Sequence, residues 1–434
     1  MNNSIKPWLI LSHAFNMDGR AASQTITDKI PFLIEEHVQP IVVSAVTGYQ
    51  DQTITHIQVL PWGGPGLRFD LRHLIRRHFG QKIIYKILMA LISTAVLPLI
   101  VIEKLLLGLQ SQWSWSVPAM IRSIWLIKKY DVKLVYSTGG AYSAHLAAYW
   151  LKKLMGIHWI CEVHDPMVKP GHPPKTRDEK FQSRLENKIC RSADFIWWFT
   201  DGALKSAKER NPELGNKGVV IIPGANPPMV KSEYMKRDKL IFAHFGSLSE
   251  TRSLSQFFDA LEAFNNQHPE AQGQFEVHIY GASLDKASKK ILQNSSIKSK
   301  VIEHGRLEYS KSLNLSGREQ VAMRMQEADC LLLAHGHIPE CAEYIPSKLY
   351  EYFWAQRPIF GMTHDNAQIN RLITERQGYV APSTDIHAIS TAITQIYKDW
   401  QSGSLAKQST QLAPIGVDQA THQIVKECIA RGLM

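Results

Sequence analysis

The sequence alternates short apolar runs with longer amphipathic segments, and this alternation constrains the fold more than any other feature. Such a pattern predicts right-handed βαβ units, in which helices connect the strands of a parallel sheet. In the first half we expect strands at 8–12, 41–46, 134–137, 159–163, 195–199 and 219–222, with helices at 24–36 and 142–155.

The alternation restarts after the segment 223–239, whose prolines and charged residues are typical of a linker. A chain of 434 residues also exceeds what one hydrophobic core usually serves. The sequence therefore predicts an α/β protein with two doubly wound Rossmann-like domains that face a cleft. The second half should contain strands at 240–245, 275–280, 301–304, 330–334 and 358–362, with helices at 254–265, 347–355 and 386–400.

We expect an N-terminal domain over 1–225, a C-terminal domain over 226–410, and a final segment over 411–434 that packs back on the N-terminal domain. In doubly wound sheets, ligands bind at the carboxyl ends of the strands. Three expected strands end in glycine, which either lets a ligand approach the backbone or forms an ordinary turn. These glycines are Gly246, Gly281 and Gly305.

The chain has a net charge of +10, and part of this excess lies in one short window. A basic excess is typical of proteins that bind nucleic acid, anionic lipid or phosphorylated substrates. The window has no interleaved aromatic ladder, and neither zinc-finger spacing nor an RNP-like string follows, so we expect no nucleic-acid partner. Its basic residues are Arg68, Arg72, Arg76, Arg77, Lys82 and Lys86, opposed only by Asp70.

An uncharged apolar run over 87–102 follows this window, and Pro98 interrupts it. The run leaves three alternatives open. It is a buried helix pair in a large domain, part of a monotopic surface over 68–115 that dips into the inner leaflet of a membrane, or a true membrane span. A span usually requires about 20 apolar residues, which is more than this run contains.

The five cysteines are scattered and form no C-x-x-C pair, which favours a reducing compartment without disulfides. The apolar residues near the N-terminus are too few for the core of a signal peptide. We therefore expect a cytoplasmic protein, either free or peripheral on the inner face of the plasma membrane.

The segment 340–358 holds the richest combination of functional side chains. Glu343 follows an expected strand, and Ser347 begins a helix. Lys348 and Glu351 then share one face of that helix. A nucleotide sugar offers a ribose diol, which suits a carboxylate, and a diphosphate, which suits a cation at a helix N-terminus. The alternative is a solvated, charged helix end.

Arg252 supplies a second cation in the loop after Gly246, and a guanidinium can fork onto phosphate oxygens. Together with Lys348 it would neutralise a departing diphosphate without a bound metal, whereas the alternative is a surface arginine. The histidine-rich window 335–341 matches no standard zinc spacing. We therefore expect neither a metal nor a cofactor.

Three residues of the first half are candidates for contacts with the sugar and the acceptor. Gly19 lies in the loop after the first strand, where a missing side chain lets the backbone approach a substrate. His164 would hydrogen-bond the donor sugar, and Asp165 would orient either the acceptor or the imidazole. The alternative is a structural His–Asp pair.

The chain resembles retaining glycosyltransferases of the family-4 group, which have the GT-B fold and build bacterial capsules, O-antigens and exopolysaccharides. The resemblance implies that Glu343 contacts the transferred sugar and Glu351 the ribose. It also implies that Arg252 and Lys348 hold the diphosphate, with His164 beside the sugar. The segments that carry the resemblance are 9–23, 137–166, 193–202, 221–224, 246–254 and 344–359, of which the last is the most specific.

The resemblance further implies retention of the donor's anomeric configuration, no metal, and closure of two domains over the cleft. The chain departs from the family pattern at two places. Many members have a lysine five residues after the diphosphate arginine, where this chain has Phe257, and many have a glycine-rich first loop, where only Gly19 is clear.

From these features we expect a hexosyltransferase that moves a hexose-type sugar from a nucleotide-diphosphate sugar to a saccharide or lipid-linked saccharide in cell-surface polysaccharide synthesis. The alternatives are a nucleotide-sugar epimerase on the same fold and a non-catalytic binding protein. The expected catalytic residues are Glu343, His164 and Asp165, and the expected donor-binding residues are Arg252, Lys348, Glu351, Gly246, Ser347 and Gly19.

Overall fold

The computed structural model describes residues 5–17, 19–80, 82–281, 283–405 and 412–434. The chain forms two compact units, each with its own core. The first unit contains Met1–Pro223 and Val417–Met434, and the second contains Gly224–Gly416. The end of the expected C-terminal domain, from residue 406, and residue 411 of the expected final segment lie outside the described residues.

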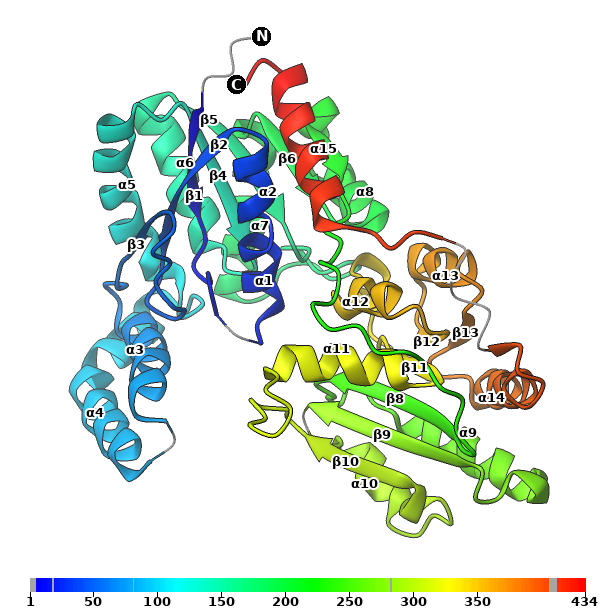
Figure 1. The fold of residues 1–434 in the computed structure, drawn as a ribbon. Coiled ribbons are helices and arrows are strands. Elements are labelled where there is room, and N and C mark those ends of the chain that lie inside the picture. Colours follow the sequence, from blue (N-terminus) through cyan, green and yellow to red (C-terminus); the bar gives the residue numbers. More distant parts are fainter. Residues whose placement is uncertain (1–4, 18, 81, 282, 406–411) are drawn as a thin grey trace. The chain divides into compact units, whose positions relative to one another are not determined.

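Within the described residues, the first unit is built on a seven-stranded parallel sheet in the order β3-β2-β1-β4-β5-β6-β7 (Figure 1). Its central strands are buried on both sides because helices cover both faces of the sheet. The strands are β1 (Lys6–Leu11), β2 (Val38–Ser44), β3 (Thr55–Gln58), β4 (Leu134–Gly139), β5 (His158–Val163), β6 (Phe195–Trp198) and β7 (Gly218–Val220). The helices are α1 (Ala21–Thr27), α2 (Ile30–Glu35), α3 (Gly64–Phe79), α4 (Ile83–Leu106), α5 (Ser116–Tyr130), α6 (Ser143–Met155), α7 (Arg177–Ser192), α8 (Asp201–Arg210) and α15 (Val417–Ala430), with short 3-10 turns η1 (Trp113–Trp115) and η2 (Pro212–Lys217).

The described part of the second unit contains a six-stranded parallel sheet in the order β10-β9-β8-β11-β12-β13. The strands are β8 (Leu240–Gly246), β9 (Phe275–Gly281), β10 (Val301–Gly305), β11 (Cys330–Ala334), β12 (Ile359–Thr363) and β13 (Tyr379–Pro382). The helices are α9 (Ser255–Gln267), α10 (Lys286–Leu292), α11 (Gly317–Glu327), α12 (Lys348–Ala355), α13 (Ala367–Thr374) and α14 (Ile386–Gln401), with 3-10 turns η3 (Pro269–Ala271), η4 (Lys298–Lys300) and η5 (Pro339–Glu343). Two doubly wound parallel sheets are thus confirmed.

In each sheet the direction of winding reverses beside the first strand. The reversal lies between β1 and β4 in the first unit and between β8 and β11 in the second. Loops that leave the carboxyl ends of two such strands run to opposite faces of the sheet, and doubly wound proteins bind ligands at that point. The fold therefore places the connections after β8 and β11 at the edge of the second sheet where proteins of this fold class bind ligands.

The C-terminal helix α15 belongs to the first unit. It packs against α2, and Ile424 joins a buried cluster that contains Trp8. An ion pair of 2.8 Å between His422 Nδ1 and Glu36 Oε1 lies on the outside of this contact. The chain therefore returns to the first unit after completing the second.

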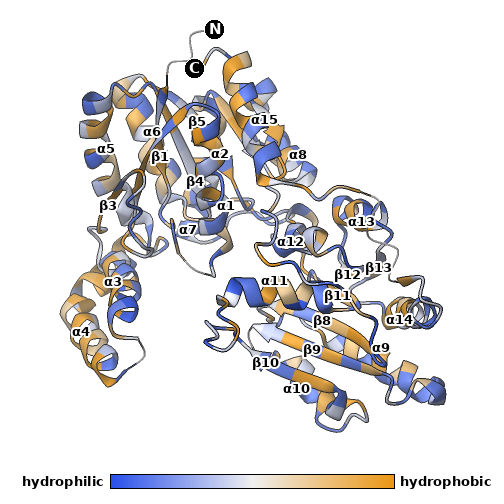
Figure 2. Ribbon diagram, viewed as in Figure 1, coloured by the Kyte–Doolittle hydropathy of each residue, from blue (hydrophilic) through white to orange (hydrophobic). Residues whose placement is uncertain are grey.

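The helices α3 and α4 form a hairpin whose second helix is largely exposed (Figure 2). Among the described residues, α4 is the one helix long and apolar enough to cross a membrane, and 11% of its most apolar 18-residue stretch is buried. Pro98 lies inside this helix without ending it. A buried helix pair is therefore wrong for 87–102, because the helices do pair but most apolar side chains of α4 stay at the surface.

Among the strands, the sequence pattern missed two, and it also missed the break in the helix expected over 24–36. Both missed strands, β3 and β13, are edge strands, and neither has the continuous burial of a central strand. The expected helix 24–36 is divided into α1 and α2, because Pro31 lies in the first turn of α2 and cannot continue the preceding helix.

Candidate functional site

Two glycines form the floor of the candidate site at the carboxyl ends of β8 and β9. Gly246 and Gly281 are paired in register and have φ angles of 102° and 113°. A Cβ atom on Gly246 would lie 2.4 Å from Lys348 Nζ, and one on Gly281 would lie 2.8 Å from the Gly246 carbonyl oxygen. Gly305 differs, because open space surrounds the position of its Cβ and it serves only as a turn residue.

Helix α12 presents Lys348 to the end of β8. The Lys348 Nζ donates a hydrogen bond to the carbonyl of Phe245. Tyr352 holds the helix in place, since its hydroxyl accepts from the Phe245 N–H at 3.3 Å and donates to a carbonyl of β11 at 3.2 Å. Burial, and then the nearby Arg252 guanidinium, lower the pKa of Lys348 to about 8, whereas Glu351 raises it. Lys348 is thus a poorly solvated cation at neutral pH.

Arg252 lies close to Lys348, on the loop between β8 and α9. Backbone hydrogen bonds of 3.0 and 3.1 Å between Ser249 and Arg252 close this loop into a tight turn. A Cβ on Gly336 would come within 3.4 Å of Arg252 Cγ, so the arginine stem packs on that glycine. Burial, Lys348 and Arg252 together hold the pKa of His244 well below its usual value, so both cations act on the end of β8.

Glu351 lies on α12 three residues after Lys348 and lines a pocket of about 170 Å³. This pocket lies between α11, α12 and the segment 226–229. Trp354 Nε1 donates a hydrogen bond of 2.6 Å to the carbonyl of Ala225, which holds that segment against α12. The pocket is large enough for part of a nucleoside and has one carboxylate of α12 in its wall.

Glu343 lies at the end of η5, in the connection between β11 and α12, and is 5% exposed. Asn366 fixes this connection, because its side-chain amide donates to the carbonyls of Cys341 and Tyr344 at 2.9 and 3.0 Å. The connection that carries the Glu343 carboxyl group is therefore held in one conformation.

Three of the four predicted charged residues act on one another in this arrangement. Both Arg252 and Glu351 shift the pKa of Lys348, and Glu343 lies in the connection that leads into the same helix. Ser347 directly precedes α12 and is exposed, but its side chain does not cap the helix as a serine at that position usually does. Phe257, at the position where many family members have lysine, is fully buried in the core of the second unit.

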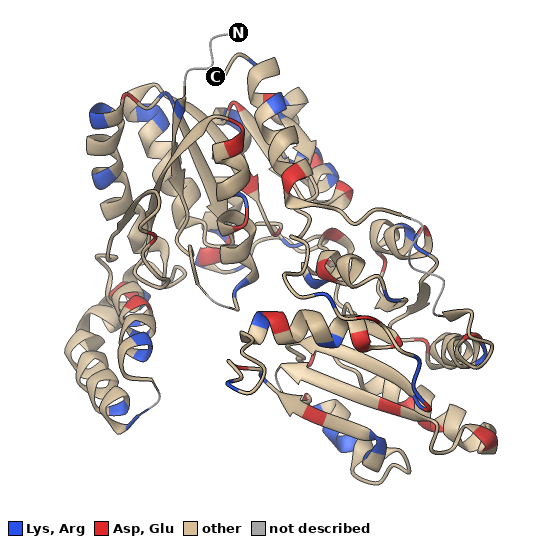
Figure 3. Ribbon diagram, in the orientation of Figure 1, with Lys and Arg blue, Asp and Glu red and all other residues tan. Residues whose placement is uncertain are grey.

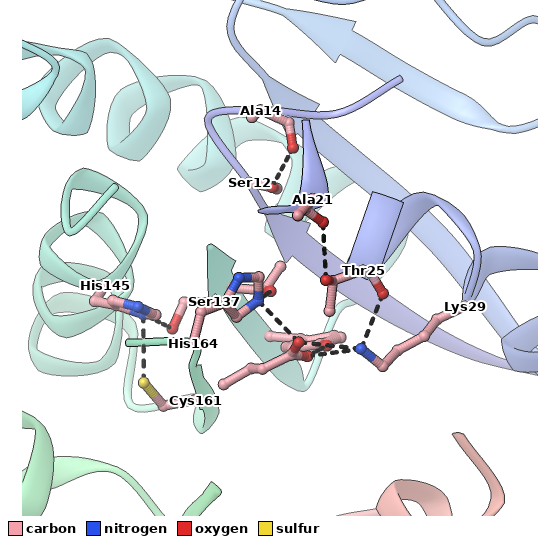
Figure 4. Close-up of polar contacts among 12 residues, drawn as sticks. Ser12, Ala14, Ala21, Thr25, Lys29, Ser137, His145, Cys161 and His164 are labelled. Carbon is pink, nitrogen blue, oxygen red and sulfur yellow. Dashed lines mark hydrogen bonds and ion pairs between the residues drawn. The ribbon is translucent and has the colours of Figure 1, made fainter. Parts of the chain in front are cut away.

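Figure 4 shows a buried polar network in the first unit that ends at His164. His164 Nε2 lies 2.9 Å from Glu162 Oε1 and 3.1 Å from Thr138 Oγ1. Lys29 Nζ forms an ion pair of 3.0 Å with the same Glu162 oxygen. The Tyr136 hydroxyl donates to the other oxygen of that carboxylate. The imidazole is therefore held at the carboxyl end of β5 by groups from two strands, Thr138 of β4 and Glu162 of β5.

Glu162 is charged although it is fully buried. Burial alone would raise the pKa of its carboxyl, but the Lys29 ammonium and then His164 outweigh burial and hold the pKa below its usual range. Sequence analysis overlooked both residues. Glu162 interrupts an otherwise apolar strand, which is a usable signal, whereas Lys29 lies 133 residues away and only the fold brings it near.

Asp165 and Gly19 lie outside this network. Asp165 is exposed, and the imidazole contacts Glu162 and Thr138 instead, so the alternative in which Asp165 orients the ring is not the observed arrangement. A contact between Asp165 and the acceptor stays a prediction. Gly19 is exposed in the loop after β1 and has a φ of 67°.

No group of three His, Cys, Asp or Glu side chains that could hold a metal ion occurs among the described residues. In the histidine-rich window, His335 is buried and its Nε2 lies 3.1 Å from the carbonyl oxygen of Tyr344. Metal independence stays a prediction.

No protein-family model and no curated protein matches the chain. Solved structures match it over nearly its full length at low identity. Sucrose-phosphate synthase from Thermosynechococcus elongatus is 12% identical over 98% of this chain and 99% of its own, with a TM-score of 0.63. The lipopolysaccharide outer core galactosyltransferase WaaB is 13% identical over 97% and 99%, with a TM-score of 0.55.

A protein described as a UDP-N-acetylglucosamine 2-epimerase from Listeria monocytogenes is also similar, with 10% identity over 99% of this chain and 96% of its own and a TM-score of 0.51. Glycosyltransferases and an epimerase thus share this architecture. The similarities establish the GT-B fold for the chain, and the reaction has to be argued from the residues of the site.

Proposed function

We propose that the protein is a glycosyltransferase that moves a hexose-type sugar from a nucleotide-diphosphate sugar to a saccharide or lipid-linked saccharide, with retention of configuration. The observation that carries the proposal is the pair of cations, Arg252 and Lys348, beside Gly246 of β8, which borders the switch point of the second sheet. A diphosphate suits such a place because it needs positive charge and close approach to the backbone. The fold shared with sucrose-phosphate synthase and WaaB agrees with this function.

The cations would act on the leaving group. When the bond between the sugar and the diphosphate breaks, negative charge grows on the phosphate oxygens. Arg252 would donate two hydrogen bonds to these oxygens. Lys348 and the N-terminus of α12, which follows β11, would bind them from the other side. Because Lys348 is poorly solvated before the ligand arrives, its attraction for a phosphate is stronger than that of a lysine in water.

The two carboxylates would bind hydroxyl groups. Glu351, in the wall of the pocket between α11 and α12, would accept hydrogen bonds from the ribose diol, and the pocket would take the base. Glu343, held on its fixed connection, would accept from hydroxyls of the transferred sugar. These contacts would position the donor. Positioning, together with stabilisation of the charge on the leaving diphosphate, would supply most of the rate increase.

In the first unit, His164 would lie beside the transferred sugar, with its ring oriented by Glu162. Asp165 and the backbone at Gly19 would contact the acceptor. The acceptor hydroxyl would attack from the face that the diphosphate leaves, which retains the configuration. We further propose that the reaction serves cell-surface polysaccharide synthesis and takes place in the cytoplasm, where the five cysteines, all free and buried, would stay reduced.

A thermal-shift experiment tests the proposal. The full chain is heated with UDP, UDP-glucose, UDP-N-acetylglucosamine or GDP-mannose, and the same is done with Lys348→Ala. A ligand at one hundred times its Kd stabilises the folded state by about 2.7 kcal/mol, so Tm should rise for the parent and much less for the variant. Lys290→Ala, which removes an exposed lysine of α10, is the matched control and should shift like the parent. An equal rise in Tm for the parent and Lys348→Ala would show that this lysine does not bind the nucleotide.

Product analysis separates the transferase from an epimerase, whose fold the chain also shares. Incubation of the full chain with a labelled nucleotide sugar and a glycolipid extract should move the label into the lipid or saccharide fraction. Conversion of the nucleotide sugar to its epimer without any acceptor would favour the epimerase. Equal transfer with and without EDTA is expected, because the phosphate charge is neutralised by side chains.

A further inference from the structure

The outer side of α4 is apolar along its whole length (Figure 2). With 3.6 residues per turn, Ile83, Ile87, Leu91, Ile102 and Leu105 lie on one side of the helix, and each is more than half exposed. Soluble proteins rarely leave so long an apolar stripe uncovered, and such stripes usually mark an interaction surface.

The opposite side of α4 packs on α3. Met89 and Val96 are buried there, and Arg68 Nε of α3 donates to Ser93 Oγ of α4 at 2.8 Å. A Cβ on Gly64 would lie 2.9 Å from a side-chain atom of Leu99, so the two helices approach closely. The apolar stripe is therefore the unpaired side of a packed hairpin.

The hairpin is fastened to the first unit from both helices. Arg177, at the start of α7, donates to the carbonyls of Leu105 and Leu106 at 2.7 and 3.1 Å and so caps the end of α4. On α3, Asp70 pairs with His13 at 3.2 Å, and both side chains are buried. Any partner that binds α4 would therefore be attached to the whole first unit.

The charge exposed on the described part of the hairpin is positive (Figure 3). Its two acidic residues are both engaged, since Asp70 is buried against His13 and Glu103 accepts from Trp113 Nε1 at 2.5 Å. This charge attracts an anionic lipid surface and repels a second copy of the same hairpin. The basic residues are Arg68, Arg72, Arg76, Arg77, Lys82, Lys86 and Lys104.

The paired arrangement excludes a crossing of the bilayer by α4 within this fold. Because α3 runs beside α4, a crossing would bring the arginines of α3 into the hydrocarbon, where charged side chains are strongly disfavoured. A helix in the plane of the membrane avoids this. Its apolar side enters the acyl boundary, while Lys86 and Lys104, on one flank, reach the headgroups.

We propose that α4 docks the protein on an anionic membrane surface, with its apolar stripe buried at the acyl boundary and α3 on the headgroup side. The inference rests on the hairpin alone and is independent of the proposed glycosyl transfer. It assigns the region 68–115 to a monotopic contact and gives a lipid-linked acceptor a direct route to the enzyme.

Vesicle flotation with the full chain tests the inference. Vesicles of phosphatidylcholine with about 30% phosphatidylglycerol are compared with pure phosphatidylcholine at low and high salt. The parent should float with the anionic vesicles, and Ile87→Glu/Leu91→Glu should lower the bound fraction roughly tenfold. Both substituted side chains are more than half exposed, so the fold should be kept, which circular dichroism and Tm verify.

Two further variants complete the test. Leu154→Glu changes an equally exposed leucine on α6 and should float like the parent. Arg76→Glu/Lys86→Glu should remove the preference for anionic vesicles. Flotation that is unchanged by Ile87→Glu/Leu91→Glu would overturn the proposal. So would a lipid-free dimer of the parent, seen by light scattering, that the same variant makes monomeric, because the stripe would then be covered by a second copy.

Discussion

At the scale of single residues, two buried charges show how the environment decides the state of a side chain. Glu162 stays ionised because Lys29 and His164 face it. Burial, and then the second cation Arg252 beside it, lower the pKa of Lys348 to about 8. The proposed diphosphate would reverse this effect on Lys348, so its binding would be coupled to proton uptake by this side chain.

This coupling predicts a pH dependence of nucleotide binding. Between pH 7 and pH 9 the free protein loses most of the charge on Lys348, so the affinity for UDP should fall about tenfold. Isothermal titration in two buffers of different ionisation enthalpy should also detect proton uptake near pH 8. In Lys348→Met, binding should be weak and flat over this range.

Destabilisation of the fold by deprotonation of Lys348 would not explain a loss of UDP affinity at high pH. Because folding lowers the pKa of Lys348 from 10.5 to about 8, the unfolded chain binds this proton more tightly between these values. The contribution of this group to stability therefore rises with pH in that window. A UDP affinity that is constant from pH 7 to pH 9 in the parent would contradict the assignment of Lys348 to the phosphate.

At the scale of elements, the site depends on how strands end. The sequence pattern correctly located β8, β11 and α12, with Gly246 at the end of β8, Arg252 in the loop after it and Lys348 at the start of α12. It gave Gly246, Gly281 and Gly305 the same two alternatives and chose only Gly246 as a donor-binding residue, whereas the structure distinguishes Gly305 from the other two. A side chain on either of the first two would meet a neighbouring group, whereas open space surrounds Gly305.

Substitution of these glycines should therefore have different effects. Gly246→Ala combines a positive φ with a Cβ that would lie 2.4 Å from Lys348 Nζ, and we expect it to cost about 1–3 kcal/mol of unfolding free energy and to abolish nucleotide binding. Gly305→Ala has the unfavourable φ without the contact and should keep nucleotide binding. Urea denaturation and thermal shift measure both variants. Full nucleotide binding by Gly246→Ala would show that the ligand does not approach this strand end.

At the scale of the whole molecule, the two units differ in how the chain builds them. The second unit is one continuous stretch, Gly224–Gly416, whereas the first needs the C-terminal residues Val417–Met434 in addition to Met1–Pro223. Helix α15 completes the first unit because Ala420, Ile424 and Val425 are buried in a core cluster of that unit.

This difference predicts the behaviour of fragments. Residues 224–416, produced alone, should fold cooperatively and retain the UDP-induced thermal shift, because Arg252, Lys348 and Glu351 and the pocket beside α12 lie within them. Residues 1–223 should fold poorly, because the surface that α15 covers would be exposed to water. A 224–416 fragment that folds but gives no shift with UDP would mean that binding requires residues of the first unit.

The sequence by itself determined the two doubly wound sheets and the positions of most strands, because hydrophobic period, strand-end glycines and helix starts are local signals. It also singled out Arg252, Glu343, Lys348 and Glu351, whose contacts with a donor stay a prediction. Only the tertiary structure revealed the pairing of Lys29 with Glu162, the lowered pKa of Lys348 and the exposure of α4. These depend on which residues meet across the fold and on how much water each retains. An apolar run has the same sequence pattern whether it is buried or exposed, so hydrophobic periodicity could not show that α4 is exposed.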